Sequence, residues 1–302
     1  MSSIREESDM IEAGMAFQPV TAKVLRDLRR RQQESPRTVD LPWPTLSRMC
    51  RGPGGGRGFA HGWHVIVGGL TGGGKTLAGL NLACSAMRQG VGVMYVSLEM
   101  SHATLLTRLR AIASGHDIMS VEWGGGFNEA KAEDADTQIM ELPGCLLVNP
   151  EPIWELPDIS AAIRYSVRRE NVRLVVIDYA QLIAAGRPDG ALFERMLAVS
   201  AELTHAAKTE GVVVVTLSQL NNAATRERRH EPTEESVYGG GRLVHDCDML
   251  LLLNYAQHKY DPIRRRAESE LIVRKNRNGP TGKFPIEVDY RTLRITEFSP
   301  SG

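Results

Sequence analysis

A run of eight residues from Gly69 to Thr76, GLTGGGKT, combines three consecutive glycines with a lysine and a threonine. It fits the pattern G-x-x-x-x-G-K-[ST] and lies between an apolar run and an amphipathic run. In such a loop, backbone N–H groups and the positive end of the following helix surround phosphate oxygens. Lys75 would reach the β- and γ-phosphates, and the Thr76 hydroxyl would complete the coordination of Mg²⁺. We therefore predict a site for ATP and Mg²⁺ formed by Gly69, Thr71, Gly72, Gly73, Gly74, Lys75 and Thr76.

Three polar residues end apolar runs and could act on the same phosphates. Asp178 follows the letters LVVI, Glu99 follows VMYVSL, and Gln219 follows VVVVTLS. Because parallel strands bring their carboxyl ends to one edge of a sheet, we expect these side chains beside the glycine loop. Asp178 is predicted to hold Mg²⁺ through water, and Glu99 to orient the attacking water as the catalytic base. Gln219 could sense the γ-phosphate, although its spacing is equally consistent with a solvent-facing strand end.

These residues need a buried sheet to hold them in place. Apolar runs that are too continuous to have one wet face alternate with amphipathic runs, which is typical of strand–helix units in an α/β fold. Strands are predicted over residues 63–69, 91–99, 145–150, 172–183, 212–220 and 248–253. Helices are predicted over Lys75–Gln89, Ser101–Ser114, Pro157–Glu170 and Gly190–Glu210. The last alternating runs predict antiparallel strands at one side of the sheet, over residues 270–277, 283–290 and 292–298.

The composition excludes several classes of protein. A hydrophobic fraction of 42% and a charged fraction of 24% over 302 residues are ordinary for a globular protein with one principal core. No apolar run approaches the roughly 18 residues of a membrane span, and no secretory signal is recognisable, so we expect a cytoplasmic protein without a membrane partner. The four dispersed cysteines argue against zinc and disulfides and are predicted to be buried free thiols. Because 36 basic and 36 acidic residues balance, any contact with nucleic acid must be local.

Two regions of different composition divide the chain. Residues 1–50 are polar and of mixed charge, whereas residues 51–302 hold the alternating runs and the glycine loop. We predict an N-terminal arm over the first region and one nucleotide-hydrolysing motor domain over the second. Within the arm, Thr21–Gln33 predicts a helix with a narrow apolar stripe, which could pack on its own domain or dock on a neighbouring subunit.

Six short motifs follow one another along the chain. They are GLTGGGKT (69–76), SLEMS (97–101), VVIDYAQL (175–182), TLSQLN (216–221), HDCDMLLLL (245–253) and IVRKNRNGPTG (272–282). In this order they resemble the motifs of the ATPase domain of DnaB-like replicative helicases, and the resemblance extends over roughly residues 60 to 298. It implies a RecA-like P-loop NTPase core, with a mostly parallel sheet flanked by helices and with C-terminal antiparallel strands.

The resemblance also implies roles for individual residues. Glu99 would be the catalytic glutamate, Asp178 the aspartate beside magnesium, and Gln219 a sensor of the nucleotide state that is coupled to DNA. Lys275 and Arg277 occupy the positions from which members of this family reach the nucleotide of the neighbouring subunit. A guanidinium placed there would stabilise charge on the transferring phosphoryl group. Without the resemblance, both cations would be interpreted as solvated residues of an edge strand.

The implied activity is ATP-driven translocation of a hexameric ring along single-stranded DNA, with separation of the duplex. The first 50 residues are too few for the family's N-terminal helical domain, through which its cellular members meet primase, so recruitment by that route is not expected. A loader or a primase is kept as a candidate partner. Thr21–Gln33 lies about where the family has a linker helix that docks on the adjacent subunit, which favours the docking interpretation of the arm.

The loop that faces DNA in this family has a different sequence here. It reads EESVYGGGRLVHD over residues 234–246, and the Arg and Glu of the family loop have no counterpart at Tyr238 and Gly239. Gly239, Gly240 and Gly241 could instead offer backbone N–H groups to successive phosphates, with Arg242 adding charge and Tyr238 stacking on a base. A glycine-rich surface loop without DNA contact is the alternative. The charge runs TRERRH (225–230) and IRRRAE (263–268) are interpreted as solvated loops.

Two further functions fit the same motifs. A recombination or branch-migration ATPase similar to RadA also uses a Lys-Asn-Arg element. A regulatory ring subunit could bind ATP and join another helicase's ring with little turnover. Unwinding of a forked substrate would distinguish a helicase from the recombination ATPase. Turnover of ATP would distinguish it from the regulatory subunit.

Overall fold

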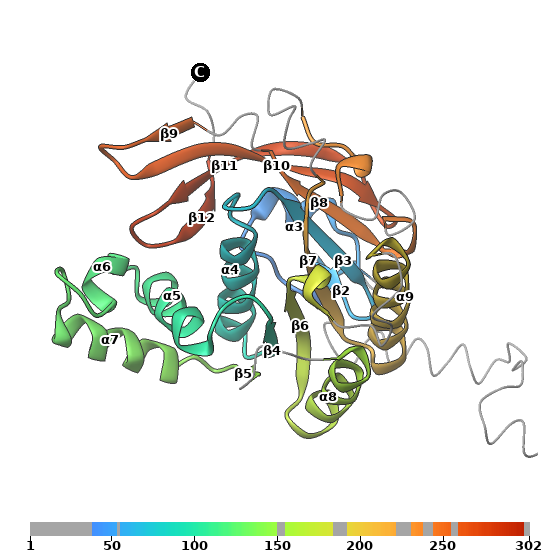
Figure 1. Cartoon of the computed structure of the whole chain (residues 1–302), viewed down its shortest axis with the longest axis horizontal. Coiled ribbons are helices and arrows are strands. Elements are labelled where there is room, and N and C mark those ends of the chain that lie inside the picture. Colours follow the sequence, from blue (N-terminus) through green and yellow to red (C-terminus); the bar gives the residue numbers. More distant parts are fainter. Residues whose placement is uncertain are drawn as a thin grey trace, which may run out of the picture. The chain divides into compact units, whose positions relative to one another are not determined.

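The computed structural model describes residues 38–52, 55–149, 155–183, 192–221, 231–237, 244–254 and 259–298. The predicted helix Thr21–Gln33, the charge run 225–230 and the predicted DNA-contacting residues Tyr238–Arg242 lie outside these described residues. The described part forms an α/β unit around a ten-stranded sheet (Figure 1). Among the helices in these ranges, none combines the length and the hydropathy needed to cross a bilayer.

Parallel strands form the centre of the sheet. Side by side they run in the order β8, β3, β7, β6, β4 and β5. Their bounds are His64–Gly69 (β3), Gly92–Ser97 (β4), Leu146–Val148 (β5), Val172–Asp178 (β6), Val213–Gln219 (β7) and Met249–Leu253 (β8). All except the edge strand β5 are almost entirely buried, which explains why their sequences are continuously apolar. The predicted α/β fold with a mostly parallel sheet is thus confirmed.

Long helices cover both faces of this sheet (Figure 1). They are α4 (Lys75–Arg88), α5 (His102–Ser114), α8 (Leu156–Arg169) and α9 (Leu192–Glu210), all near the predicted bounds. Alternate residues of β3 supply the two cores: Val65 and Val67 join a cluster with α4 and α5, whereas Ile66 joins a cluster with α8 and α9. The sheet is therefore held between two apolar layers, with the carboxyl ends of its strands left at one edge.

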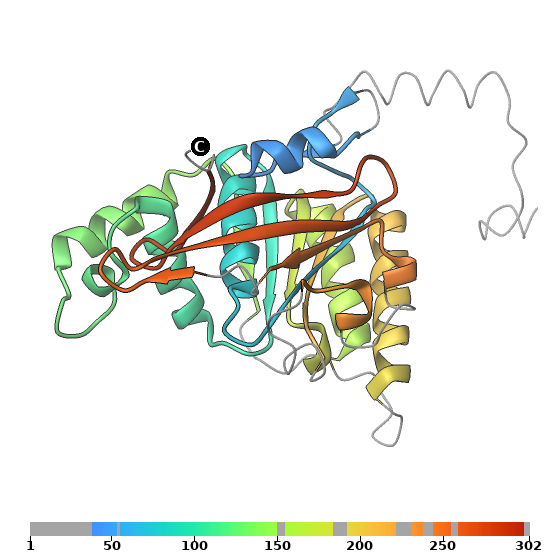
Figure 2. The same cartoon turned by 90° about the horizontal axis from the view of Figure 1, so that it is seen from above.

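The C-terminal strands extend the sheet in antiparallel fashion, as predicted. They are β10 (Arg266–Asn276), which pairs with β8, then β11 (Gly282–Asp289) and β12 (Arg294–Glu297). The short β9 (Lys259–Asp261), which was not predicted, also pairs with β10. Figure 2 shows β10 and β11 crossing the described unit towards the helices that follow β4. The interpretation of residues 263–268 as a solvated loop holds for Ile263 and Arg264, which are exposed in a turn. It was wrong for the rest, because Arg266–Glu268 belong to β10 and Arg265 pairs with Asp117.

Several short elements were not predicted from the sequence. They are β1 (Thr38–Val39), α3 (Pro44–Met49), β2 (Phe59–Ala60), α6 (Ile118–Val121), α7 (Glu129–Met140) and the 3-10 turns η2 (Ala180–Leu182) and η3 (Glu234–Ser236). Residues 38–50, predicted to belong to the arm, pack on the sheet unit, where Trp43 donates from Nε1 to the Ile295 carbonyl at 3.2 Å. Three of the four free cysteines are buried as predicted, but Cys145 is exposed because β5 is an edge strand.

Candidate nucleotide-binding site

The glycine loop connects β3 to α4, as the sequence predicted. Gly74 stands at the N-cap of α4 with φ at +88°, a backbone conformation that residues with a side chain rarely adopt. Gly73 passes so close to the Leu70 carbonyl that a Cβ would lie 2.9 Å from its oxygen. Lys75 is 9% exposed and donates from Nζ to the same carbonyl oxygen at 3.0 Å. The loop is therefore tightly wound, with its N–H groups at the positive end of a 14-residue helix.

A cavity of about 670 Å³ opens beside this loop, within the size range of small-molecule sites. The loop contributes Thr71, Gly72, Gly74, Lys75 and Thr76 to its wall. Glu99 and Gln219 reach the same cavity from the carboxyl ends of β4 and β7. The rest of the wall comes from Leu77, Met100, Thr104, Thr107, Arg108, Ile118, Glu122, Tyr179, Tyr290 and Leu293.

Asp178 ends β6 and is only 1% exposed. Its Oδ2 accepts a hydrogen bond from the Tyr95 hydroxyl at 3.0 Å, whereas its Oδ1 is buried with no hydrogen-bond partner within the described ranges. Burial raises the pKa of this carboxyl, and polar contacts with Thr76 and Tyr95 oppose the rise. A buried carboxylate oxygen of this kind, next to a threonine hydroxyl, fits the hard oxygen ligands that Mg²⁺ prefers.

The charged residues of the site interact electrostatically with one another. Burial lowers the pKa of Lys75, and the carboxylates of Asp178 and Glu99 act in the opposite direction. Glu99 also raises the pKa of Asp178, since two like charges disfavour ionisation. Lys75 and Glu99, predicted from separate motifs, therefore line one cavity, and Asp178 lies close enough to both to act on them electrostatically.

Two glutamines join the sheet edge to the glycine loop. Gln219 donates from Nε2 to the Thr71 hydroxyl at 2.7 Å, so it does not simply face solvent. Gln181, in the turn after β6, donates from Nε2 to Ser218 Oγ at 2.9 Å and accepts from the Gln219 N–H at 3.4 Å. Gln181 was not predicted as a site residue, although it lies in the motif VVIDYAQL. The adjacency of β6 and β7 creates this contact, and adjacency is not visible in a linear sequence.

Lys275 and Arg277 lie away from the nucleotide cavity. Lys275 donates from Nζ to the carbonyls of Val244 and His245 at 2.6 and 2.7 Å, and Arg277 donates from Nη2 to His245 at 2.8 Å. Neither residue lines the cavity. β10 ends beside the first residue of β8, Met249, which pairs with Val65 near the start of β3.

The glycine loop leaves the opposite end of β3, after Gly69. The distance from Val65 to Gly69 corresponds to about 13 Å along the strand. The two cations are therefore not brought together with the nucleotide cavity of their own chain.

Comparison with known proteins agrees with this geometry. The family model described as the DnaB-like helicase C terminal domain matches residues 56–297. The chain belongs to this family. It is 28% identical over 253 residues to the replicative DNA helicase DnaB of Treponema pallidum, which covers 80% of this chain and 53% of that protein. It is 30% identical over 221 residues to the DnaB of Mycobacterium intracellulare, covering 72% of this chain and 38% of that protein.

Solved structures show the same fold. One solved ATPase domain superposes with a TM-score of 0.77 at 19% identity, covering 94% of this chain and all of that domain. A DnaB-like replicative helicase, solved in a study of its interactions with primase, gives 0.78 at 20% identity and covers 98% of this chain and 71% of that one. The chain spans about half the length of the Treponema pallidum protein and 38% of the Mycobacterium intracellulare protein, so it matches the C-terminal domain of this family and not the whole length of these relatives.

Proposed function

We propose that this DnaB-family domain hydrolyses ATP with Mg²⁺ and uses the energy to move a hexameric ring along single-stranded DNA and separate the duplex. One observation supports this most directly: Lys75, Glu99 and the buried Oδ1 of Asp178 converge at the edge of one sheet beside a complete phosphate loop. The residue types and their placement are those that phosphoryl transfer to water requires. We expect the protein to work in the cytoplasm, with a loader or a primase as a candidate partner.

Each residue has a proposed task in hydrolysis. The loop N–H groups would hold the β-phosphate, and Lys75 would exchange the Leu70 carbonyl for phosphate oxygens. Mg²⁺, held by Thr76 and Asp178, would supply positive charge to the phosphates. Glu99 would orient the attacking water and take its proton. Gln219 would report the γ-phosphate, because its amide already contacts Thr71 of the loop.

Completion of the site would require a second subunit. Lys275 and Arg277 are at the other end of β3 from the loop, which supports a role at the nucleotide of an adjacent copy. A guanidinium inserted there would stabilise the charge that builds on the transferring phosphoryl group. Translocation on DNA is further proposed to use residues 238–242, with Tyr238, the three glycines and Arg242 contacting the strand.

Measurement of ATP turnover with and without oligo-dT tests the proposal. We expect turnover that rises with single strands, and we expect unwinding of a forked duplex. Lys75→Ala should lower turnover by about 100-fold or more, because a charge-assisted contact to the phosphates is lost. Lys131→Ala is the matched control, since Lys131 is exposed on α7 away from the cavity wall.

Other outcomes would select other functions. Strand exchange or branch migration without unwinding would indicate a recombination ATPase, and ATP binding without turnover in mixed rings would indicate a regulatory subunit. Native mass measurement with a non-hydrolysable nucleotide and oligo-dT would give the ring size and the occupancy of the strand together. No hydrolysis by the pure protein at any concentration, with single strands present, would defeat the proposal.

A further inference from the structure

Part of the cavity wall has no task in phosphate chemistry. The phosphates of a bound nucleotide would lie at the glycine loop, because the loop N–H groups and Lys75 are there. The remaining wall includes an aromatic ring, two aliphatic side chains and a carboxylate, from Tyr290, Ile118, Leu293 and Glu122. An apolar wall with a few polar groups is what a ribose and a base require. The nucleoside half of a bound nucleotide therefore belongs against these residues.

Two segments that are far apart in the sequence build this wall. Ile118 and Glu122 come from α6 and its C-cap, whereas Tyr290 and Leu293 come from the turn between β11 and β12. A direct backbone bond joins the two segments, from the Ile118 N–H to the Arg291 carbonyl at 2.7 Å. A four-residue helix such as α6 has little stability of its own, so further contacts must hold it against the turn.

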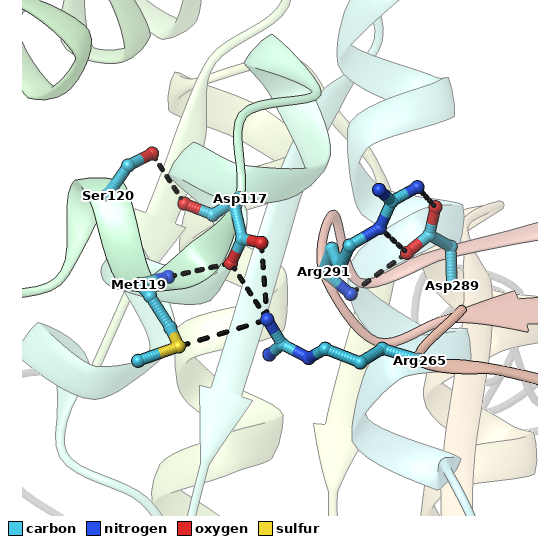
Figure 3. Close-up of polar contacts among 6 residues, drawn as sticks. All are labelled: Asp117, Met119, Ser120, Arg265, Asp289 and Arg291. Atoms are coloured by element: carbon cyan, nitrogen blue, oxygen red, sulfur yellow. Dashed lines mark hydrogen bonds and ion pairs between the residues drawn. The ribbon is translucent and has the colours of Figure 1, made fainter. Parts of the chain in front are cut away.

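Arg265 contacts both segments at once. Its carbonyl accepts from the Tyr290 N–H at 2.9 Å. Its guanidinium reaches Asp117, with Nη1 at 3.2 Å from Oδ2 and 3.4 Å from Oδ1 (Figure 3). Arg265 takes φ of +51°, in the left-handed region that a residue with a side chain seldom occupies. The turn before β10 thus directs both the backbone and the side chain of this residue to the cavity wall.

Asp117 transmits the contact to α6. Its Oδ1 accepts from the Met119 N–H at 3.1 Å, which caps the helix, and its carbonyl accepts from the Ser120 hydroxyl at 2.7 Å (Figure 3). On the other side, Asp289 accepts from the Arg291 N–H at 2.9 Å and shapes the turn that carries Tyr290. The side chains of Arg265 and Asp117 are 34% and 36% exposed, so water screens the pair only in part.

We propose that Arg265 is a positioning residue for the nucleoside half of the nucleotide: it braces α6 against the β11–β12 turn and so sets the distance between Ile118 and Tyr290. Arg265 would affect the contacts with the base and the ribose, whereas the phosphates would bind to the glycine loop. This inference rests on the proposed function, because it presumes that a nucleotide occupies the cavity.

The test compares two ligands that share the phosphates and differ in the nucleoside, MgATP and magnesium tripolyphosphate, by calorimetric titration of the full chain. Arg265→Ala should weaken MgATP binding by roughly three- to tenfold, as expected for loss of a partly exposed ion pair, and should change tripolyphosphate binding by less than about twofold. Asp117→Asn keeps the cap acceptor and removes the charge, so it should reproduce the effect without disturbing the helix start. In turnover, KM for ATP should rise while kcat is retained.

Arg264→Ala is the matched control, because Arg264 is the preceding residue and its side chain is 79% exposed beside Asp261. It should leave both affinities unchanged, and Arg265→Lys should recover part of the loss. Equal weakening of both ligands by Arg265→Ala and Asp117→Asn, or unchanged MgATP binding in both variants, would overturn the inference. A wild-type chain that binds neither ligand would overturn the proposed function itself.

Discussion

In its proposed role the carboxylate of Asp178 would have to stay ionised to hold Mg²⁺, yet this side chain is almost fully buried. Burial raises its pKa, and the hydroxyl of Tyr95, 3.0 Å away, opposes that rise. Tyr95 is itself buried, and burial together with the neighbouring charge of Asp178 raises its pKa well above the ordinary range. The rise favours the protonated hydroxyl, which is the form that donates to Asp178.

Substitution of Tyr95 by Phe should consequently change the pH dependence of the site. Loss of the donor raises the pKa of Asp178 further, so the carboxylate is protonated at a higher pH than in the wild type. Activity that needs the ionised form is then lost earlier as the pH falls, and the acidic limb of turnover should move up by about one pH unit, given about 1.5 kcal/mol for a hydrogen bond to a charged group.

The pH profile of Mg²⁺-dependent ATP turnover measures this shift. Tyr165→Phe is the control, because Tyr165 is 62% exposed on α8. Profiles of Tyr95→Phe and the wild type that superimpose on the acidic side would show that the hydroxyl does not support the carboxylate.

The site residues differ in how far a sequence can predict their positions. Lys75 and Asp178 could be predicted because neighbouring residues in the sequence mark each of them. Lys75 lies in the glycine loop, and Asp178 follows an apolar strand. Tyr95, Gln181 and Arg265 could not be predicted, because each acts on a residue 37 or more positions away. Those contacts exist because β4 lies beside β6, β6 beside β7, and the start of β10 beside α6.

At the scale of elements, the extent to which a strand or helix is buried determined whether it could be predicted from the sequence. The central strands are buried on both faces, so their apolar runs are unambiguous. Helix α7, by contrast, has the sequence EAKAEDADTQIM and buries only Ala132 and Ala135. Its large apolar residues therefore do not recur at the spacing of a helix. Helix α3 has six residues and one buried side chain, Leu46, which is too short a pattern to detect. Tertiary packing, rather than local preference, fixes both.

The stability of α3 offers a test of that view. Leu46 is fully buried in the same core as α4 and β12, so Leu46→Ala should lower the free energy of unfolding by about 2–4 kcal/mol through lost burial and a cavity. Leu106→Ala, at a leucine of α5 that is 37% exposed, should cost less than about 1 kcal/mol. Urea unfolding without nucleotide measures both. Equal losses would mean that residues 38–50 are not part of the folded core.

At the scale of the whole molecule, the glycine loop and the two cations Lys275 and Arg277 lie near opposite ends of β3, and this separation predicts active sites that are shared between subunits. The glycine loop leaves one end of the strand, and Asp248, which pairs with Arg277 at 3.6 Å, accepts from the His64 N–H at the other end. Burial lowers the pKa of Lys275, and the negative charge of a neighbour's phosphates would favour its charged form. Each protomer would then supply a pocket on one side and two cations on the other.

Mixtures of two inactive variants test this arrangement. Arg277→Ala should leave ATP binding largely intact and suppress hydrolysis by about 1000-fold, and Glu99→Gln should also stop hydrolysis. A pocket from an Arg277→Ala subunit next to a Glu99→Gln subunit has both an intact base and an intact guanidinium. In an equal mixture about a quarter of the interfaces are of this kind, so turnover should recover to as much as about a quarter of the wild-type value.

The decisive control mixes Glu99→Gln with Lys75→Ala. Both changes affect the pocket, so every interface in this mixture contains a damaged pocket although every subunit keeps Arg277. No turnover should return there, whereas it should return in the first mixture once native mass measurement has confirmed co-assembly. Equal recovery in both mixtures would indicate contamination by active protein. Absence of recovery in the first, despite mixed rings, would mean that Arg277 does not act across the boundary, and that the contacts with His245 and Asp248 seen within one chain are its whole role.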